Sequence, residues 1–168
     1  MATITGTAGD DRSENSLVGG PDDDLILGLE GRDNLTGLEG NDTLDGGAGD
    51  RDAARYLNSP SPIVGNLTTN TVSDGYGGTD TLIDIEDIRG SEGNDTLIGG
   101  TEGETYLYGN GGDDVLTANN TSTTGGTILN GGNGNDTLTN IGGEWSFMEP
   151  GAGTDLITGA DNSYDIVS

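Results

Sequence analysis

The stretch that decides the fold runs from residue 19 to residue 45 and repeats every nine residues. It reads Gly-Gly-Pro-Asp-Asp-Asp-Leu-Ile-Leu (19–27), Gly-Leu-Glu-Gly-Arg-Asp-Asn-Leu-Thr (28–36) and Gly-Leu-Glu-Gly-Asn-Asp-Thr-Leu-Asp (37–45). Each unit has glycine first, aspartate sixth and an aliphatic residue eighth. A period of nine is too short for the common helical repeats and is typical of a half-turn of a parallel β-helix, in which a glycine-rich bend precedes a short strand. We therefore expect Ile26, Leu35 and Leu44 to point inward, and Asp24, Asp33 and Asp42 to lie where bend meets strand.

These units resemble the nonapeptide of the repeats-in-toxin family, Gly-Gly-x-Gly-x-Asp-x-aliphatic-x. A single Gly-Asn-Asp occurs in many turns, but consecutive units in one register, with more units downstream, make the match specific. The resemblance implies an all-β fold, a right-handed parallel β-roll (a β-helix solenoid) with calcium ions stacked between the bends.

The charge of the chain is strongly one-sided. Its 30 acidic and 5 basic side chains give a net charge of −25, and it contains no His and no Cys. Such a surface argues against binding to nucleic acid or to an anionic membrane, and no apolar stretch is long enough for membrane insertion. Oxygen ligands remain, and they favour calcium. Without metal the composition is typical of a disordered chain, so we expect cations to close the fold.

The period divides the chain into segments of a single β-roll domain spanning residues 1–168. Residues 1–18 form an N-terminal cap, 19–54 a first repeat block, 55–74 an irregular insert, 75–158 a second block and 159–168 a C-terminal cap. We expect the insert to stay attached to the roll, the alternative being a hinge between two calcium-binding blocks. Trp145, Phe147 and Met148 are expected to fill a widened part of the roll rather than to form a binding patch.

From residue 90 onward, full nonamers alternate with irregular units. Two nonamers make one turn, so alternate units share one edge of the roll. The sequence therefore predicts that this half binds calcium on one edge, while the other edge keeps only an inward apolar column. That column consists of Ile88, Leu107, Leu129, Phe147 and Ile166.

The resemblance also implies a ligand set. In the family, the lower of two stacked bends supplies its second and fourth carbonyl groups and its aspartate, and the upper bend supplies its first and third carbonyl groups and its aspartate. Carried onto this chain, the first block holds sites at Gly20, Asp22 and Asp24 with Gly37, Glu39 and Asp42, and at Leu29, Gly31 and Asp33 with Gly46, Ala48 and either Asp50 or Asp52. Leu29, Leu38 and Tyr76 replace the second glycine of their units and Asp22 the fourth, so those bends are expected to be strained or differently shaped.

The second block holds the remaining implied sites, in which Asp114 and Asp136 bridge neighbouring ions. They are Tyr76, Gly78 and Asp80 with Gly90, Glu92 and Asp95; Ser91, Gly93 and Asp95 with Gly109, Gly111 and Asp114; Asn110, Gly112 and Asp114 with Gly131, Asn133 and Asp136; and Gly132, Gly134 and Asp136 with Pro150, Ala152 and Asp155.

The function that the resemblance implies is a non-catalytic, calcium-folded extracellular module, secreted by a type I system and folding where calcium is plentiful. No Sec-type signal is visible at residues 1–6, which agrees with that route. Residues 164–168, Tyr-Asp-Ile-Val-Ser, are similar to the terminus of some type I substrates and equally fit a last strand. No catalytic residue is expected, because nearly every acid lies in a bend or on a polar edge. The alternative is a glycan-binding or adhesin-type module appended to an extracellular enzyme, with a polysaccharide as partner.

Overall fold

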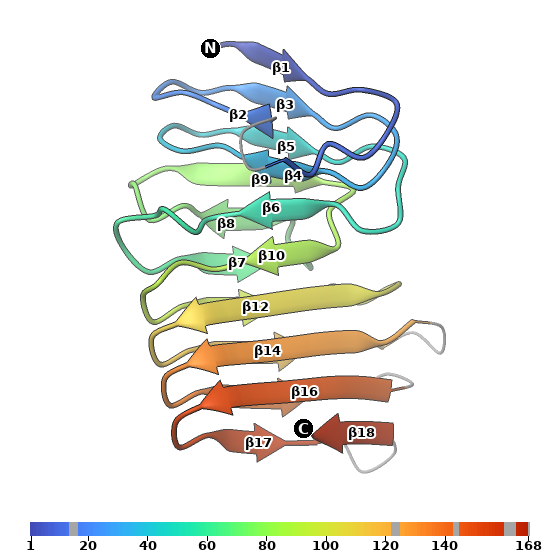
Figure 1. Ribbon diagram of the computed structural model, residues 1–168, viewed down its shortest axis with the longest axis vertical. Coiled ribbons are helices and arrows are strands. Elements are labelled where there is room, and N and C mark those ends of the chain that lie inside the picture. Colours follow the sequence, from blue (N-terminus) through green and yellow to red (C-terminus); the bar gives the residue numbers. More distant parts are fainter. Residues whose placement is uncertain (14–16, 122–124, 143–144, 160–163, 168) are drawn as a thin grey trace.

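The computed structural model of the protein describes residues 1–13, 17–121, 125–142 and 145–159, and the backbone of 164–167. Every regular element in that part of the chain is a β-strand, and the strands form two sheets (Figure 1). In spatial order, sheet A consists of β1 (Thr3–Thr5), β3 (Leu25–Leu27), β5 (Thr43–Asp45), β9 (Thr79–Ile83), β8 (Thr71–Ser73), β7 (Val64–Asn66), β11 (Thr96–Ile98), β13 (Val115–Ala118), β15 (Thr137–Asn140) and β17 (Leu156–Thr158). Sheet B consists of β2 (Leu17–Val18), β4 (Asn34–Thr36), β6 (Ala53–Arg55), β10 (Asp87–Arg89), β12 (Thr105–Gly111), β14 (Thr127–Asn133), β16 (Trp145–Ala152) and β18 (Tyr164–Val167).

The chain coils from one sheet to the other, so most neighbours in a sheet are parallel and one full turn apart. Ile26 of β3, for example, lies beside Leu44 of β5. In Figure 1 the nearer strands β12, β14 and β16 run to the left and the farther strands run to the right as the chain descends, which makes the coil right-handed. The predicted parallel β-roll is confirmed.

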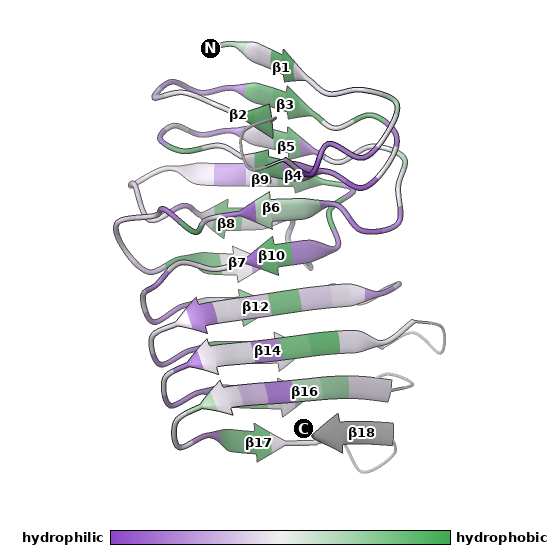
Figure 2. Ribbon diagram, viewed as in Figure 1, coloured by the Kyte–Doolittle hydropathy of each residue, from purple (hydrophilic) through white to green (hydrophobic). Residues whose placement is uncertain are grey.

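Two columns of apolar side chains fill the space between the sheets. Ile26, Leu35 and Leu44 are fully buried, as the nine-residue period predicts. Ile26 and Leu44 belong to the column of sheet A, which continues in the second block through Leu97, Leu116 and Leu138; that of sheet B runs through Leu17, Leu35, Ala54, Ile88, Leu107 and Leu129. Figure 2 shows hydrophobic (green) bands on strands of both sheets, for example on β3 and β5 and on β12 and β14. Each buried leucine contributes about 1.5–3 kcal/mol, so the columns hold successive turns in register.

The prediction that Phe147 points inward is wrong. Met148 lies beside Leu129 and is buried, whereas Phe147 lies beside Ile128 and is half-buried on the outer face of β16 with Trp145. A shift of one residue along a strand moves every side chain to the opposite face, and the irregular unit before β16 hides that shift from the nine-residue count. Met148 therefore fills the roll. Ile166 lies beside Phe147 in the ladder, and its side chain lies outside the described residues.

The insert lies inside sheet A rather than beside it. β7 and β8 form an antiparallel hairpin that pairs with β11 on one side and with β9, also antiparallel, on the other. Gly65 occupies the inward position of β7, where a Cβ atom would stand 3.1 Å from the side chains of both Ile88 and Leu97. The hairpin thus separates β9, at the start of the second block, from β11 and the later strands of that block.

Cationic and aromatic side chains gather on the outer face of sheet B, where the two blocks meet. The guanidinium of Arg51 lies 3.7 Å from the ring centre of Tyr106 and donates a hydrogen bond of 2.6 Å to the Tyr108 hydroxyl. Buried Asp87 lies 3.8 Å from Arg51 Nε and 3.2 Å from Arg89 Nη2. Arg55, the last residue of β6, lies beside Arg89. We call Arg51, Arg55 and Arg89, with the groups they contact, the arginine cluster.

No helix that is long and apolar enough to cross a membrane occurs in the described part of the chain.

Candidate metal centre

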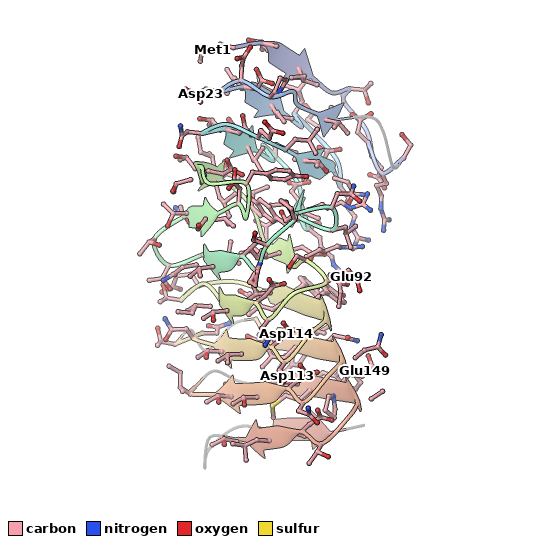
Figure 3. The ribbon with its side chains drawn as sticks, turned by 90° about the vertical axis from the view of Figure 1, so that its left-hand side faces the viewer. Met1, Asp23, Glu92, Asp113, Asp114 and Glu149 are labelled. Atoms are coloured by element: carbon pink, nitrogen blue, oxygen red, sulfur yellow. The ribbon has the colours of Figure 1, made fainter. Side chains whose placement is uncertain are left out.

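The nine-residue spacing of the repeat places aspartates on the two edges of the roll. We call the bends that lead into sheet A edge A, and the bends that lead into sheet B edge B; Figure 3 looks onto edge A. The sixth-position residue of each full unit comes just before its strand or at its start, and its side chain turns into the bend. On edge A these residues are Asp24, Asp42, Asp80, Asp95, Asp114 and Asp136, all at most 4% exposed.

The aspartates of one edge form a ladder that runs along the roll. The Asp114 Oδ1 atom accepts the N–H of Asp95 at 2.7 Å, and the Asp136 Oδ1 atom accepts the N–H of Asp114 at 2.8 Å. Further steps of the same kind join Asp24 to Asp42, Asp42 to Asp80, Asp136 to Asp155 and, on edge B, Asp33 to Asp52. These hydrogen bonds fix one oxygen of each carboxylate and aim the other into the bend.

The second carboxylate oxygen is buried without a hydrogen-bond partner. This holds for the Oδ2 atoms of Asp33, Asp42, Asp52, Asp74, Asp114 and Asp136. At the first glycine of a unit, this oxygen meets a main-chain carbonyl of the next turn. A Cβ atom on Gly109 would stand 2.0 Å from Asp114 Oδ2 and 2.6 Å from the Gly131 carbonyl oxygen. Buried oxygens that face other oxygens repel one another unless a cation lies between them.

The donor set of these bends fits calcium, which takes six to eight oxygen ligands from carboxylates and carbonyl groups. In the described part of the chain, no three acidic side chains converge closely enough to hold a metal by themselves. Any bound ion must therefore draw most of its ligands from main-chain carbonyl groups. Bends rich in glycine provide these groups, because glycine tolerates the positive φ that turns a carbonyl inward.

Burial raises the pKa values of most ladder carboxyls in the metal-free protein, among them Asp33, Asp42, Asp95 and Asp136, whereas main-chain hydrogen bonds lower the pKa of Asp24. Burial, reinforced by the neighbouring charges of Asp95 and Asp136, raises the pKa of Asp114 from 3.8 to about 7. Burial also raises the pKa of Asp80 to about 7 and that of Asp52 to about 6. The folded metal-free chain thus holds protons more tightly than the unfolded chain does.

A pH dependence with a defined sign follows for the metal-free protein. A raised pKa in the folded state contributes stability that is fully present below the unfolded value of 3.8 and is lost as the pH rises through about 7. In the presence of a chelator we therefore expect the chain to form more β-structure at pH 5 than at pH 8. Far-UV circular dichroism at the two pH values measures this, and a β-content that rises with pH between these values would contradict it.

Several bends depart from the glycine-rich pattern, and non-glycine residues in them adopt positive φ values. Leu29 and Leu38 adopt φ values of 84° and 75°, in the left-handed region that leucine occupies at a cost. The predicted strain at these two positions is observed. Around Tyr76, the neighbouring Gly75 and Gly77 take the positive φ values instead.

Replacing Leu29 by glycine is expected to stabilise the protein. The Leu29 side chain is 41% exposed, so its removal costs little burial, while relief of the left-handed conformation gains about 1 kcal/mol. Denaturant unfolding at saturating calcium measures the change. Leu29→Ala serves as control, because alanine retains a Cβ and hence the strain; equal stabilities of the Gly and Ala variants would refute this explanation.

The structure stacks most of the bends that the sequence pairs. Bends 20–24 and 37–42, 91–95 and 109–114, 110–114 and 131–136, and 132–136 and 150–155 lie in neighbouring turns of edge A. Bends 29–33 and 46–52 are neighbours on edge B, joined by the bridge between Glu30 and Ala48. Of the two candidates in the latter bend, buried Asp52 takes the ladder position, while Asp50 is exposed.

One predicted pairing is wrong. The bend with Tyr76, Gly78 and Asp80 does not stack on the bend with Gly90, Glu92 and Asp95, because β8 and β7 lie between β9 and β11. It stacks instead on bend 37–42, where the Asp42 N–H donates to Asp80 Oδ1 at 2.9 Å. On the other side of the hairpin, next to β11, the Asp95 Oδ1 atom accepts the N–H of Ile63, a residue of the insert.

Sequence reasoning missed two acidic residues of these edges. Asp74 is fully buried just before the Tyr76 bend, and its signal is an aspartate directly before Gly-Tyr-Gly-Gly, the composition of a side-chain-capped turn. Glu86 accepts the N–H of Asp52 at 2.9 Å and so continues the ladder of edge B into a shortened unit. There the longer glutamate side chain replaces a sixth-position aspartate, which no count of nine residues detects.

Comparison with known proteins points to the same repeats. The family model of the RTX calcium-binding nonapeptide repeat matches the chain in four copies, at residues 18–51, 83–101, 100–120 and 121–139. No curated protein is similar enough to count as a match.

Proposed function

Because the chain belongs to the family of RTX calcium-binding nonapeptide repeats, we propose that it is a module whose folding is driven by calcium and which works outside the cell. The observation that carries the proposal is the row of buried carboxylate oxygens without partners. Main-chain carbonyl oxygens of another turn accompany those of Asp33, Asp52, Asp74, Asp114 and Asp136. A divalent cation supplies the missing positive charge.

The proposed ligands are the stacked pairs of bends described above. On edge A, Asp114 and Asp136 each face two neighbouring bends, so each bridges two ions. On edge B, Asp33 and Asp52 serve one ion between the bends of the first block. Calcium, when bound, cancels the repulsion between carboxylates; the chain itself fixes one oxygen of each carboxylate and excludes water with its apolar columns.

The same electrostatics suit a protein that leaves the cell unfolded. In a calcium-poor cytosol, ionised ladder aspartates repel one another and oppose closure of the roll, and extracellular modules bind calcium with Kd values of roughly 10⁻⁴–10⁻³ M. Folding then follows export, which is the logic of type I secretion. The role is structural, and we assign no catalytic residue. The alternative role is binding of an extracellular polysaccharide. A glycan screen of the calcium-saturated protein tests it, and measurable affinity for a polysaccharide would support it.

The test is a calcium titration of chelator-treated protein followed by far-UV circular dichroism, with magnesium as control. We expect a cooperative change from coil to β-structure at millimolar calcium or below. Magnesium is expected to produce no such change, because it demands near-ideal octahedral geometry and gives up its water reluctantly. A chelated protein that is already fully β and indifferent to calcium would overturn the proposal.

A further inference from the structure

The hairpin of the insert creates a junction that the repeat pattern does not describe. There, bend 37–42 of the first block stacks on the bend between β8 and β9, which contains Gly75 to Gly78. The family model matches bend 37–42 but not the bend that contains Gly75 to Gly78. None of the segments that match the family model therefore includes a carboxylate from the bend with Gly75 to Gly78.

The aspartate in the sixth place of the bend with Gly75 to Gly78 has its second oxygen engaged. Asp80 Oδ2 accepts a hydrogen bond of 3.0 Å from the hydroxyl of Tyr56, and both side chains are buried. In Asp42, Asp114 and Asp136 the corresponding oxygen has no partner. The tyrosine of the insert thus occupies the oxygen that Asp42, Asp114 and Asp136 leave without a partner.

A second carboxylate enters the junction from the other side of the bend. Asp74 is 0% exposed, and its Oδ1 atom accepts the N–H groups of Tyr76, Gly77 and Gly78 at 2.8–2.9 Å. These three hydrogen bonds fix the orientation of the carboxylate. Its Oδ2 atom is buried and has no hydrogen-bond partner.

The free oxygen of Asp74 faces bend 37–42. A Cβ atom on Gly78 would stand 2.8 Å from Asp74 Oδ2 and 1.9 Å from the Gly40 carbonyl oxygen. On edge B, a Cβ atom on Gly49 would stand 2.9 Å from Asp52 Oδ2 and 1.9 Å from the Gly31 carbonyl oxygen. Asp74 therefore has the same relation to Gly78 as Asp52 has to Gly49.

We propose that Asp74 is the upper carboxylate ligand of an additional calcium site, formed with the carbonyl group of Gly40 and the free Oδ2 atom of Asp42. The inference rests on the proposed calcium binding and extends it to a residue outside the repeat motif. The Oδ2 atoms of Asp42 and Asp74 are both buried without partners, and the two carboxylates repel each other, since Asp74 is among the charges that raise the pKa of Asp42. A cation at this junction removes that repulsion, as in the regular bends. The ion fastens the antiparallel hairpin to the first block.

The first test counts bound calcium in matched variants. Wild-type protein, Asp74→Asn and Asp45→Asn are dialysed at a fixed calcium concentration above the folding midpoint, and calcium per chain is measured by atomic absorption. Asparagine keeps the oxygen that accepts the three N–H groups and removes the charge. Asp45 lies on the outer face of β5 in the first block. Asp45→Asn is the matched control, because it makes the same change of charge away from the proposed site. We expect one ion fewer in Asp74→Asn and no loss in Asp45→Asn.

Equal ion counts in all three proteins would overturn the assignment of Asp74 while leaving the regular sites intact. A wild-type protein without bound calcium would instead overturn the proposed function. Should Asp74→Asn fail to fold, crystals of the wild-type protein exchanged with terbium decide the question. An anomalous peak between Asp74 and Gly40 supports the site, and peaks in the regular bends without one at this junction refute it.

Discussion

Replacing Asp114 by asparagine is expected to remove two calcium ions and to raise the calcium concentration at the folding midpoint by at least about tenfold. Asp114 faces the bends on both sides, since it accepts the N–H of Asp95 and donates its own N–H to Asp136. Asparagine preserves the Oδ1 acceptor, so the ladder stays intact while the charge is lost. Calcium counting and a circular dichroism titration measure the two effects.

The metal-free forms of wild type and Asp114→Asn provide an independent check, because the substitution is expected to favour folding there and to oppose it in calcium. Without calcium, the Asp114 charge is repelled by Asp95 and Asp136, so Asp114→Asn is expected to form more β-structure than wild type at pH 8. Asp155→Asn serves as the matched control, because Asp155 takes part in one predicted site and its loss removes one ion. Equal losses of calcium in Asp114→Asn and Asp155→Asn would contradict the bridging role.

Replacing Gly134 by alanine is expected to lower the free energy of unfolding at saturating calcium by about 2–6 kcal/mol. Gly134 adopts a φ of 140°, a conformation open to glycine, and an added Cβ would stand 1.9 Å from the Gly112 carbonyl oxygen. That carbonyl is a predicted ligand, so the substitution strains the backbone and displaces a ligand at once. Denaturant unfolding gives the stability, and calorimetric titration gives the calcium affinity.

Gly9→Ala is the control for this substitution. Gly9 has no atom within 4 Å of an added Cβ, so the change is expected to stay within about 0.5 kcal/mol. If Gly134→Ala were as mild as Gly9→Ala, the close stacking of bends 110–114 and 131–136 would be refuted.

Where the nine-residue count is unbroken, the sequence was sufficient to predict the architecture. Position in the repeat fixes both the inward direction of Leu44 and the burial of Asp42, because each turn repeats the same geometry on the turn before it. The same logic gave the stacking of the bends around Asp114. In a solenoid each repeat contacts its neighbours only, so local register determines long-range contact.

The predictions that were wrong all depend on residues that break the count. The pairing of the Tyr76 bend required knowing that β7 and β8 enter sheet A as an antiparallel hairpin, and hairpin pairing is set by tertiary packing around Gly65. Phe147 and Met148 exchanged roles because the irregular sequence unit before β16 does not keep the nine-residue count. Glu86 was missed because a longer side chain compensates for a shorter bend.

The arginine cluster gives calcium loading a consequence for how the molecule behaves among its own copies. Metal-free chains carry a large negative charge overall, which keeps them apart. Each bound ion cancels two of those charges along the edges, while Arg51, Arg55 and Arg89 stay on the outer face of sheet B. The calcium-loaded roll is therefore expected to repel its own copies less strongly than the metal-free chain does. Loss of colloidal stability should accompany the gain of conformational stability.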